Sequence, residues 1–311
     1  MDRRALLDWY DTTKRDLPWR QDTDPYRVLV SEAMLQQTRV ETVLPYYRAW
    51  MDRWPTADAL AAANDDEVHA AWSGLGYYRR ARNLHAAAKR IAEHGWPDNL
   101  HDLPGVGPYT AAAVGSIAFD QPTAVVDGNV IRVMSRLHDV ERDVGTAAGK
   151  RAIQDAADAA LVAARPGDWN QAVMELGATV CKPNPDCSVC PVQSDCLAFQ
   201  RGTWAERPAK APKRKPKDEH IRFAYAVRDG CILLAKRPDD GLLAGTWGLP
   251  ETEAEAPVLG TAVHRFSHRT WHMTVVEHEA EGGCWIPLDG LGDIGLSTAA
   301  RRAIEAAQRS T

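Results

Sequence analysis

The chain has 311 residues, 45% of them hydrophobic and 25% charged, with a net charge of −5 at pH 7. This composition is typical of a globular protein long enough for two or three compact units. The negative charge excludes binding to nucleic acid through a global positive field, so such binding would rest on local basic patches and backbone donors.

No apolar run approaches the ~20 residues that span a bilayer. The N-terminal segment, residues 1–8, is interrupted by charge and does not predict a signal peptide. We therefore expect a cytoplasmic protein that makes no membrane contact and keeps its thiols reduced.

Residues 1–200 are predicted to be mainly helical. Alanine-rich segments at 56–69 and 81–94 have helical spacing and few β-branched residues. Asp24-Pro25 is a typical helix start, with Asp24 as N-cap and Pro25 in the first position. The helix that follows would carry Glu32.

The segment Leu103-Pro104-Gly105-Val106-Gly107-Pro108 predicts a hairpin that opens a helix over residues 110–119. Gly105 and Gly107 allow backbone conformations that are closed to other residues. The N–H groups around Gly105, Val106 and Gly107, together with the helix dipole, would favour an anion such as a DNA phosphate. The alternative is an ordinary glycine turn between two helices.

Four cysteines, spaced C-x5-C-x2-C-x5-C, lie within one short stretch: Cys181, Cys187, Cys190 and Cys196. In a reducing compartment this crowding predicts a metal site, not a disulfide framework. Four thiolates suit zinc or a [4Fe–4S] cluster. Zinc sites usually repeat C-x2-C pairs, and this stretch contains a single such pair.

After the cysteines the composition changes. Residues 201–220 alternate prolines with lysines and arginines, which predicts an extended, solvated linker. Strands are expected at 223–227 and 231–235, around a hairpin turn at Arg228-Asp229-Gly230, and again at 271–278 and 284–286. A helix over 297–308 with Ser297 as N-cap completes a unit of α+β class.

These motifs resemble those of a known family. The order of the hairpin, Val125-Val126-Asp127-Gly128-Asn129 and the four-cysteine loop resembles the helix-hairpin-helix DNA glycosylase superfamily. More narrowly, residues 31–38 and 74–78 are similar to the MutY-type adenine glycosylases, which act on adenine opposite 8-oxoguanine. Residues 241–250 and Phe266-Ser267-His268 resemble the C-terminal Nudix-like domain of that family.

The resemblance covers nearly the whole chain and implies a multidomain fold. An all-α helix-hairpin-helix glycosylase domain would occupy residues 1–200, including a [4Fe–4S] loop at 181–196. The basic, proline-rich linker at 201–220 would lead to a small α+β Nudix-like domain at 221–311 that recognises 8-oxoguanine. The glutamate-rich Nudix signature R-E-x-x-E-E is absent from the sequence, so this domain would bind without hydrolysing.

The resemblance also implies four catalytic residues. Glu32 would be the general acid for adenine N7, and Asp127 would stay ionised and stabilise the sugar. Asn129 would position Asp127 or the water. Tyr109 stands where strand-cleaving relatives carry lysine, so no Schiff base can form. The alternatives are a solvated helix face for Glu32 and a turn or N-cap role for Asp127.

Further residues are implied to bind the substrate and the cofactor. Adenine would flip out into a pocket that includes Trp19, Arg20 and Glu175. The intercalating, lesion-contacting or loop-supporting residues would be Gln37, Tyr77, Phe266, Ser267 and His268. The cluster ligands would be Cys181, Cys187, Cys190 and Cys196, although the family's first gap is six residues and this chain has five.

We therefore expect a monofunctional adenine glycosylase of base excision repair that leaves an abasic site. Its partner would be double-stranded DNA with A:8-oxoguanine or A:G mispairs, bound by a monomer in the nucleoid-containing cytoplasm. The alternatives are a thymine or uracil mismatch glycosylase, a strand-cleaving lyase and a non-catalytic lesion-binding protein.

Overall fold

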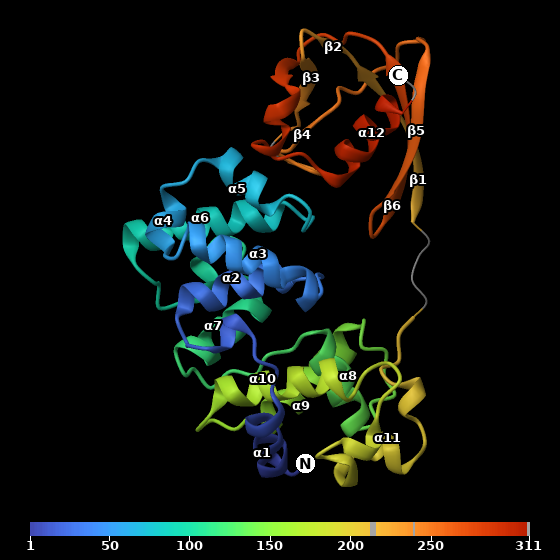
Figure 1. Ribbon diagram of the computed structural model, residues 1–311. Helices are drawn as coiled ribbons and strands as arrows, with labels where there is room; N and C mark the ends of the chain where they lie inside the picture. Colours follow the sequence, from blue (N-terminus) through green and yellow to red (C-terminus); the bar gives the residue numbers. More distant parts are fainter. Residues whose placement is uncertain (212–215, 239, 310–311) are drawn as a thin grey trace. The chain divides into compact units, whose positions relative to one another are not determined.

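The computed structural model describes residues 1–211, 216–238 and 240–309 (Figure 1). Contacts divide the chain into two compact units, Met1–Ala33 with Trp96–Pro212 and Met34–Gly95 with Lys213–Thr311. The predicted boundaries instead place residues 34–95 with the first domain. The second unit includes these helices because Asp66, Ser73 and Tyr78 bond to residues of the C-terminal segment.

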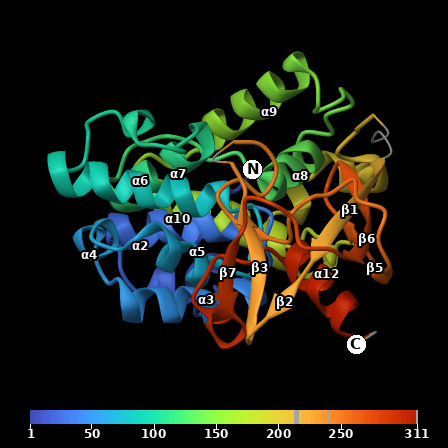
Figure 2. The same cartoon turned by 90° about the horizontal axis from the view of Figure 1, so that it is seen from above.

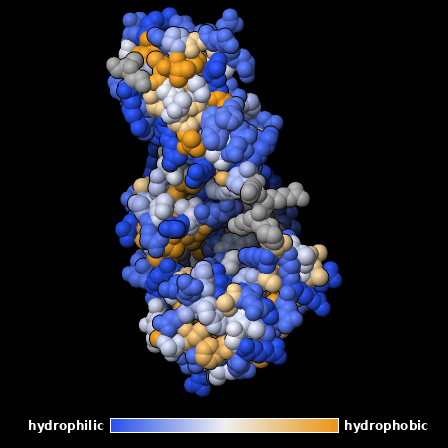
Figure 3. Space-filling model, turned by 90° about the vertical axis from the view of Figure 1, so that its right-hand side faces the viewer, coloured by the Kyte–Doolittle hydropathy of each residue, from blue (hydrophilic) through white to orange (hydrophobic). Residues whose placement is uncertain are grey.

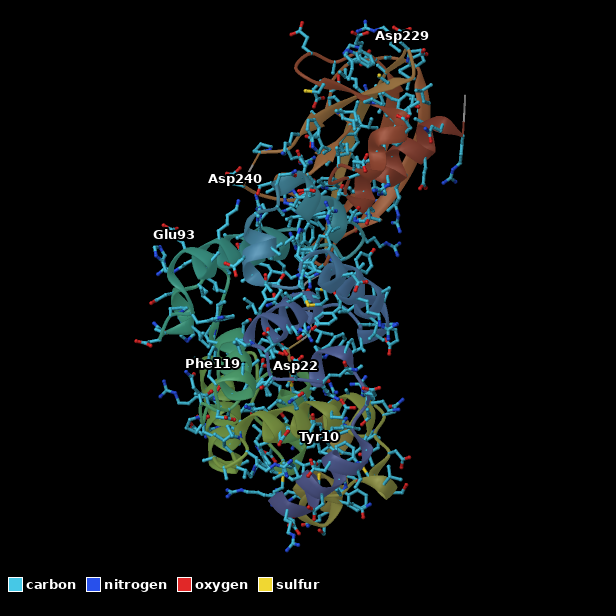
Figure 4. The ribbon with its side chains drawn as sticks, turned by 60° about the vertical axis from the view of Figure 1, so that its left-hand side comes forward. Tyr10, Asp22, Glu93, Phe119, Asp229 and Asp240 are labelled. Carbon is cyan, nitrogen blue, oxygen red and sulfur yellow. The ribbon has the colours of Figure 1, made fainter. Side chains whose placement is uncertain are left out.

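The first unit is helical. Its larger core contains Tyr10 (labelled in Figure 4), Met134, Ile153, Trp169 and Leu176, all at most 1% exposed. The helices within the described residues are α1 (Arg3–Thr13), the start of α2 (Pro25–Leu35), α7 (Pro108–Ala118), α8 (Gly128–Leu137), α9 (Ala147–Ala160), α10 (Pro166–Thr179) and α11 (Leu197–Gln200). Short 3-10 turns are η1 (Pro18–Arg20), η2 (Leu100–Asp102), η3 (Cys187–Val189), η4 (Gln193–Asp195) and η5 (Trp204–Glu206).

The second unit begins with helices α3 (Val40–Arg53), α4 (Ala57–Ala61), α5 (Asp65–Trp72) and α6 (Arg79–His94). Asn64 and Glu67 form a capping box at the start of α5, which satisfies two backbone donors. Trp50 packs edge-on against Trp72, with ring centroids 5.5 Å apart. These contacts fix the helices that carry the 74–78 turn.

The C-terminal part of the second unit contains two sheets. β1 (Lys217–Tyr225) pairs in parallel with β6 (Arg269–Glu277), which pairs antiparallel with β5 (Val258–Arg265). The other sheet is built on β3 (Cys231–Lys236), with β2 (Val227–Arg228), β4 (Trp247–Gly248) and β7 (Cys284–Pro287). The turn η6 (Leu288–Gly292) follows β7.

Helix α12 (Thr298–Gln308) packs against β5 and β6 (Figure 2). Gly260 makes the approach possible, because a Cβ there would lie 2.2 Å from the backbone oxygen of Ala306. Hydrophobic residues still reach the mostly hydrophilic surface in places (Figure 3). Val258 and Val263 of β5, for example, are 59% and 46% exposed.

Several predicted elements are confirmed. Asp24 accepts a hydrogen bond from the Arg27 amide at 2.9 Å, and α2 begins at Pro25. Ser297 caps α12 through the Ala300 amide. Asp229, at the tip of the β2–β3 hairpin (Figure 4), and Gly230 both have positive φ, as a tight hairpin turn requires.

Other predictions differ from the structure. Residues 223–225 do not pair with β3, because they belong to β1 and the other sheet. Strand β5 was not predicted, since it buries no residue fully and shows no clear apolar alternation. The predicted linker at 201–220 is too broad: Arg207 is 7% exposed and ion-paired with Asp139 at 2.8 Å, and β1 begins at Lys217. Residues 212–215 of that linker lie outside the described residues.

Of the helices in the described ranges, none combines the length and apolar content that crossing a bilayer requires.

Candidate active site

Glu32 lies in α2 and is 6% exposed, so the alternative of a solvated helix face is wrong. The Tyr109 hydroxyl, from the first turn of α7, donates a hydrogen bond to Glu32 Oε2 at 2.5 Å. Burial, together with the negative charge of Asp127, raises the pKa of Glu32 to about 7, while Tyr109 and Arg20 oppose the rise. A carboxyl group with this pKa is protonated in about half of the molecules at neutral pH and can donate that proton.

Asp127 is the N-cap of α8, as the alternative prediction stated, and the same carboxylate is the one predicted to be catalytic. Its Oδ1 accepts from the Val130 amide at 2.7 Å, and its Oδ2 accepts from Asn129 Nδ2 at 2.8 Å. Burial raises the pKa of Asp127, and these hydrogen bonds oppose the rise. Two carboxyl groups from different helices thus interact while different neighbours control each one.

Asn129 is held in turn by Arg132, which the sequence interpretation missed. Arg132 Nη2 donates to Asn129 Oδ1 at 2.9 Å, and its Nε donates to the carbonyl of Cys181 at 2.6 Å. A continuous chain of hydrogen bonds therefore runs from Asp127 to the first residue of the cysteine loop.

Asn170 of α10 is a second missed residue. It is 3% exposed; its Oδ1 accepts from the Val125 amide at 3.0 Å, and its Nδ2 donates to Ser116 Oγ and the Thr123 carbonyl, both at 2.8 Å. The segment that ends in Asp127 is thereby fixed to α7 and α10. Asn170 lies five residues before Glu175 in the sequence, but no local pattern indicates its partners.

Glu175 is 1% exposed and is bonded on both oxygens. Arg15 donates through its backbone amide, Nε and Nη2 at 2.7–3.1 Å, and Arg20 Nη2 donates at 2.9 Å. Burial alone would raise the pKa of Glu175, but the two guanidinium groups lower it to about 2. The predicted pocket residues Arg20 and Glu175 therefore meet as an ion pair that includes the unpredicted Arg15. Trp19, in η1, is 7% exposed.

The 103–107 hairpin precedes α7 as predicted, but only one of its glycines needs its special freedom. Gly105 has φ +75°, whereas Gly107 has φ −86° and ψ 179°, a conformation open to any residue. Gly107 occupies the N-cap and offers no side chain to the first N–H groups of α7. Val106 is 9% exposed, and its amide donates to the Leu103 carbonyl at 3.1 Å, so this N–H is engaged within the hairpin itself.

The four predicted metal ligands are free thiols in the loop that follows α10. Arg136 of α8 organises this loop: its Nη1 donates to Cys181 Sγ at 3.4 Å and to the Lys182 carbonyl at 2.6 Å. Within the described ranges no three His, Cys, Asp or Glu side chains are grouped as metal ligands. The donor set itself fits a thiolate-bound centre, because four soft sulfur ligands come from one loop, in which Cys181, Cys190 and Cys196 pack against the core.

The predicted lesion-contacting residues line one cavity of about 570 Å³ in the second unit. Tyr77 is 47% exposed, and its hydroxyl is hydrogen-bonded to Ser267 Oγ. Phe266 packs edge-on against Trp271, with ring centroids 4.9 Å apart. The residues brought together here are Gln37, Tyr77, Phe266, Ser267 and His268.

Comparison with known proteins identifies the class. Residues 30–159 match the family described as HhH-GPD superfamily base excision DNA repair protein, and residues 222–306 match the NUDIX domain. The fold agrees with solved structures. A thermostable thymine-DNA glycosylase aligns with a TM-score of 0.57 and 27% identity, covering 64% of this chain and 95% of that one. An endonuclease III–DNA complex aligns with a TM-score of 0.52 at 21% identity, covering 63% and 92%, which supports the fold alone.

The chain is thus an HhH-GPD superfamily protein with a C-terminal NUDIX-type domain. An adenine DNA glycosylase of Rattus norvegicus is 37% identical over 96% of this chain and 76% of its own length. That of Mycolicibacterium smegmatis is 44% identical over 65% of this chain and 72% of its own length. The chain belongs to the adenine DNA glycosylase family. It spans 61% and 58% of the lengths of the mouse and human relatives.

Proposed function

We propose that this chain removes adenine mispaired with 8-oxoguanine or guanine in duplex DNA and leaves an abasic site. The observation that carries the proposal is the pair formed by buried Glu32 and partly buried Asp127, in which Tyr109 donates a hydrogen bond to Glu32. Tyrosine has no amine, so the Schiff base that a strand-cleaving lyase needs cannot form at Tyr109. The reaction therefore stops at base release.

In the proposed mechanism, protonated Glu32 donates its proton to adenine N7. The bond between C1′ and N9 then breaks, and its electron pair leaves with the base. The developing positive charge on the sugar is stabilised by the Asp127 carboxylate, which Asn129 and the Val130 amide orient. Water adds to C1′ and loses a proton to the Glu32 carboxylate, which restores the acid.

Adenine must leave the duplex to reach Glu32. We infer that Trp19, Arg20 and Glu175 form part of the pocket that receives it. Both Glu175 oxygens are bonded to Arg15 and Arg20, so Glu175 would act by holding those two side chains. Arg20 also carries the positive charge that tempers the raised pKa of Glu32.

The cavity in the second unit would receive the base opposite adenine. Ser267 would hydrogen-bond the oxidised face of 8-oxoguanine, and Phe266 would lie beside it. Gln37 and Tyr77 would fill the space in the stack, while His268 supports the loop. The hairpin backbone at Gly105, Val106 and Gly107 would bind a DNA phosphate. The chain would act as a monomer in the cytoplasm, on nucleoid DNA.

We further propose that Cys181, Cys187, Cys190 and Cys196 hold a [4Fe–4S] cluster. A bound cluster would stabilise the loop structurally and would supply no chemistry to the base. Arg136 and Arg132 already fix the start of that loop, which would place it for contact with DNA phosphate. Iron and sulfide analysis of the purified protein separates this proposal from zinc.

A single-turnover assay tests the reaction on duplexes with A:8-oxoguanine, A:G, T:G and U:G. Products are measured as free base, and as strand breaks with and without alkali. We expect adenine release with alkali-dependent breaks, reduced about 10²–10⁴-fold in Glu32→Gln. The control Glu41→Gln changes an exposed glutamate and should leave the rate unchanged. Release of thymine or uracil, alkali-independent breaks, or DNA binding without release would each refute the proposal.

A further inference from the structure

Arg80, the second residue of α6, joins two separate segments of the second unit. One segment ends α2, and the other is the turn that precedes α6. The guanidinium group donates to acceptors in both, at 2.6–3.2 Å: from Nη1 to the carbonyls of Met34 and Gln36, and from Nη2 to Thr38 Oγ1 and the carbonyls of Leu75 and Gly76.

Each of these segments contains one exposed residue in a left-handed backbone conformation. Gln37 has φ +57° and Tyr77 has φ +48°. Residues other than glycine adopt such conformations only where their surroundings impose them. The acceptors of Arg80 flank Gln37 on both sides and directly precede Tyr77, so one side chain supports both conformations.

The guanidinium group is itself held in place. It lies 5.2 Å from the ring centroid of Trp72 and 5.5 Å from that of Tyr77. Trp72 Nε1 also donates to the Gly76 carbonyl at 3.0 Å. Burial lowers the pKa of Arg80 to about 10, which leaves it a cation at neutral pH. A planar fork with several fixed donors is specific to arginine, and lysine cannot reproduce it.

We propose that Arg80 is a positioning residue that sets the spacing of Gln37 and Tyr77, so that both enter the duplex as one preorganised wedge. The inference rests on the proposed function, in which these two residues fill the stack when adenine flips out. A wedge that is already ordered loses less conformational freedom on insertion. Arg80 would therefore lower the cost of extruding the base without touching the reacting atoms.

The test compares Arg80→Lys with the matched control Arg79→Lys, which changes an exposed neighbouring arginine. Single-turnover rates are measured on two substrates. In the first, adenine is paired with 8-oxoguanine in a continuous duplex. In the second, the same adenine stays opposite 8-oxoguanine but its neighbouring base pairs are mismatched, so it is already unstacked and the wedge is not needed.

We expect Arg80→Lys to lose on the order of 10- to 100-fold in rate on the continuous duplex and to match the unchanged chain on the second, unstacked substrate. Arg79→Lys should change neither rate. Equal losses on both substrates, or no loss on either, would overturn the inference. If the unchanged chain releases adenine from neither substrate, the proposed function itself fails.

A milder pair of variants covers the case in which Arg80→Lys does not fold. Thr38→Val removes one hydrogen-bond acceptor of Arg80, whereas Thr38→Ser keeps the hydroxyl. Thr38→Val should show a smaller loss that is again confined to the continuous duplex, and Thr38→Ser should show none. A loss in Thr38→Val that is the same on both substrates would contradict the positioning role.

Discussion

Replacing Tyr109 with phenylalanine removes the hydroxyl that donates to Glu32 Oε2 and leaves the ring in place. That hydrogen bond favours the charged form of Glu32 and so lowers its pKa from the value that burial would set. Without it, the pKa of Glu32 must rise above about 7. The acid would then stay protonated to a higher pH.

The size of the expected pKa shift follows from the strength of the hydrogen bond between Tyr109 and Glu32. A hydrogen bond to a charged group contributes about 1.5–3 kcal/mol. Because Tyr109 can also bond to the neutral acid, we take about 1.4 kcal/mol as the difference, which moves the pKa to about 8. At pH 8 about half of the variant would be protonated, against about a tenth of the unchanged chain, which predicts a roughly fivefold advantage in active fraction.

The measurement is kcat/KM against pH on a duplex with A:8-oxoguanine, because this ratio reports the pKa values of the free enzyme. The basic limb should move up by about one pH unit in Tyr109→Phe, and a weaker acid should lower the plateau modestly. Tyr225→Phe, a tyrosine change in the second unit, should leave the profile in place. A basic limb that stays fixed or moves to lower pH would refute this account of Glu32.

Three further predictions concern buried polar groups. Glu32→Gln removes a carboxyl group whose pKa is raised from 4.5 to about 7 in the folded state. Because the folded state binds this proton more tightly than the unfolded state does, the unchanged chain loses stability as the pH rises from 4.5 to about 7. In urea unfolding, the free energy of unfolding of the variant should therefore exceed that of the unchanged chain by up to about 3 kcal/mol at pH 8 and equal it at pH 4. Equal stability at both pH values would contradict this prediction. Glu175→Gln should lower the free energy of unfolding by about 3–5 kcal/mol, because it unbalances the buried Arg15 and Arg20 charges. Glu93→Gln, which changes an exposed glutamate (Figure 4), is the control. An equal loss of unfolding free energy in Glu93→Gln would contradict the explanation by unbalanced buried charge. Asn170→Ala should lower the free energy of unfolding by about 1–3 kcal/mol in the same assay. It should also lower kcat more than it raises KM, because it frees the segment before Asp127. A change in KM alone would contradict a positioning role for Asn170.

Features that depend on neighbouring residues could be predicted from the amino-acid order. The Asp24 and Ser297 caps, the turn at Gly105 and the Asp229-Gly230 hairpin tip each follow from the conformational preferences of a few adjacent residues. The motif residues could also be named from sequence, because the order of the hairpin, Asp127 and the cysteines is itself linear. The family resemblance was enough to name Glu32 but did not give its environment.

Which distant groups meet depends on how the chain folds. Strand β1 pairs with β6, about fifty residues further along the chain, and β5 forms an edge that no local pattern marks. The pKa of Glu32 depends on burial and on Tyr109, Asp127 and Arg20, which come from separate elements. Arg15, Asn170 and Arg80 take their roles from acceptors brought to them by folding. Hydrogen bonding and desolvation depend on distance in space, and a sequence gives only distance along the chain.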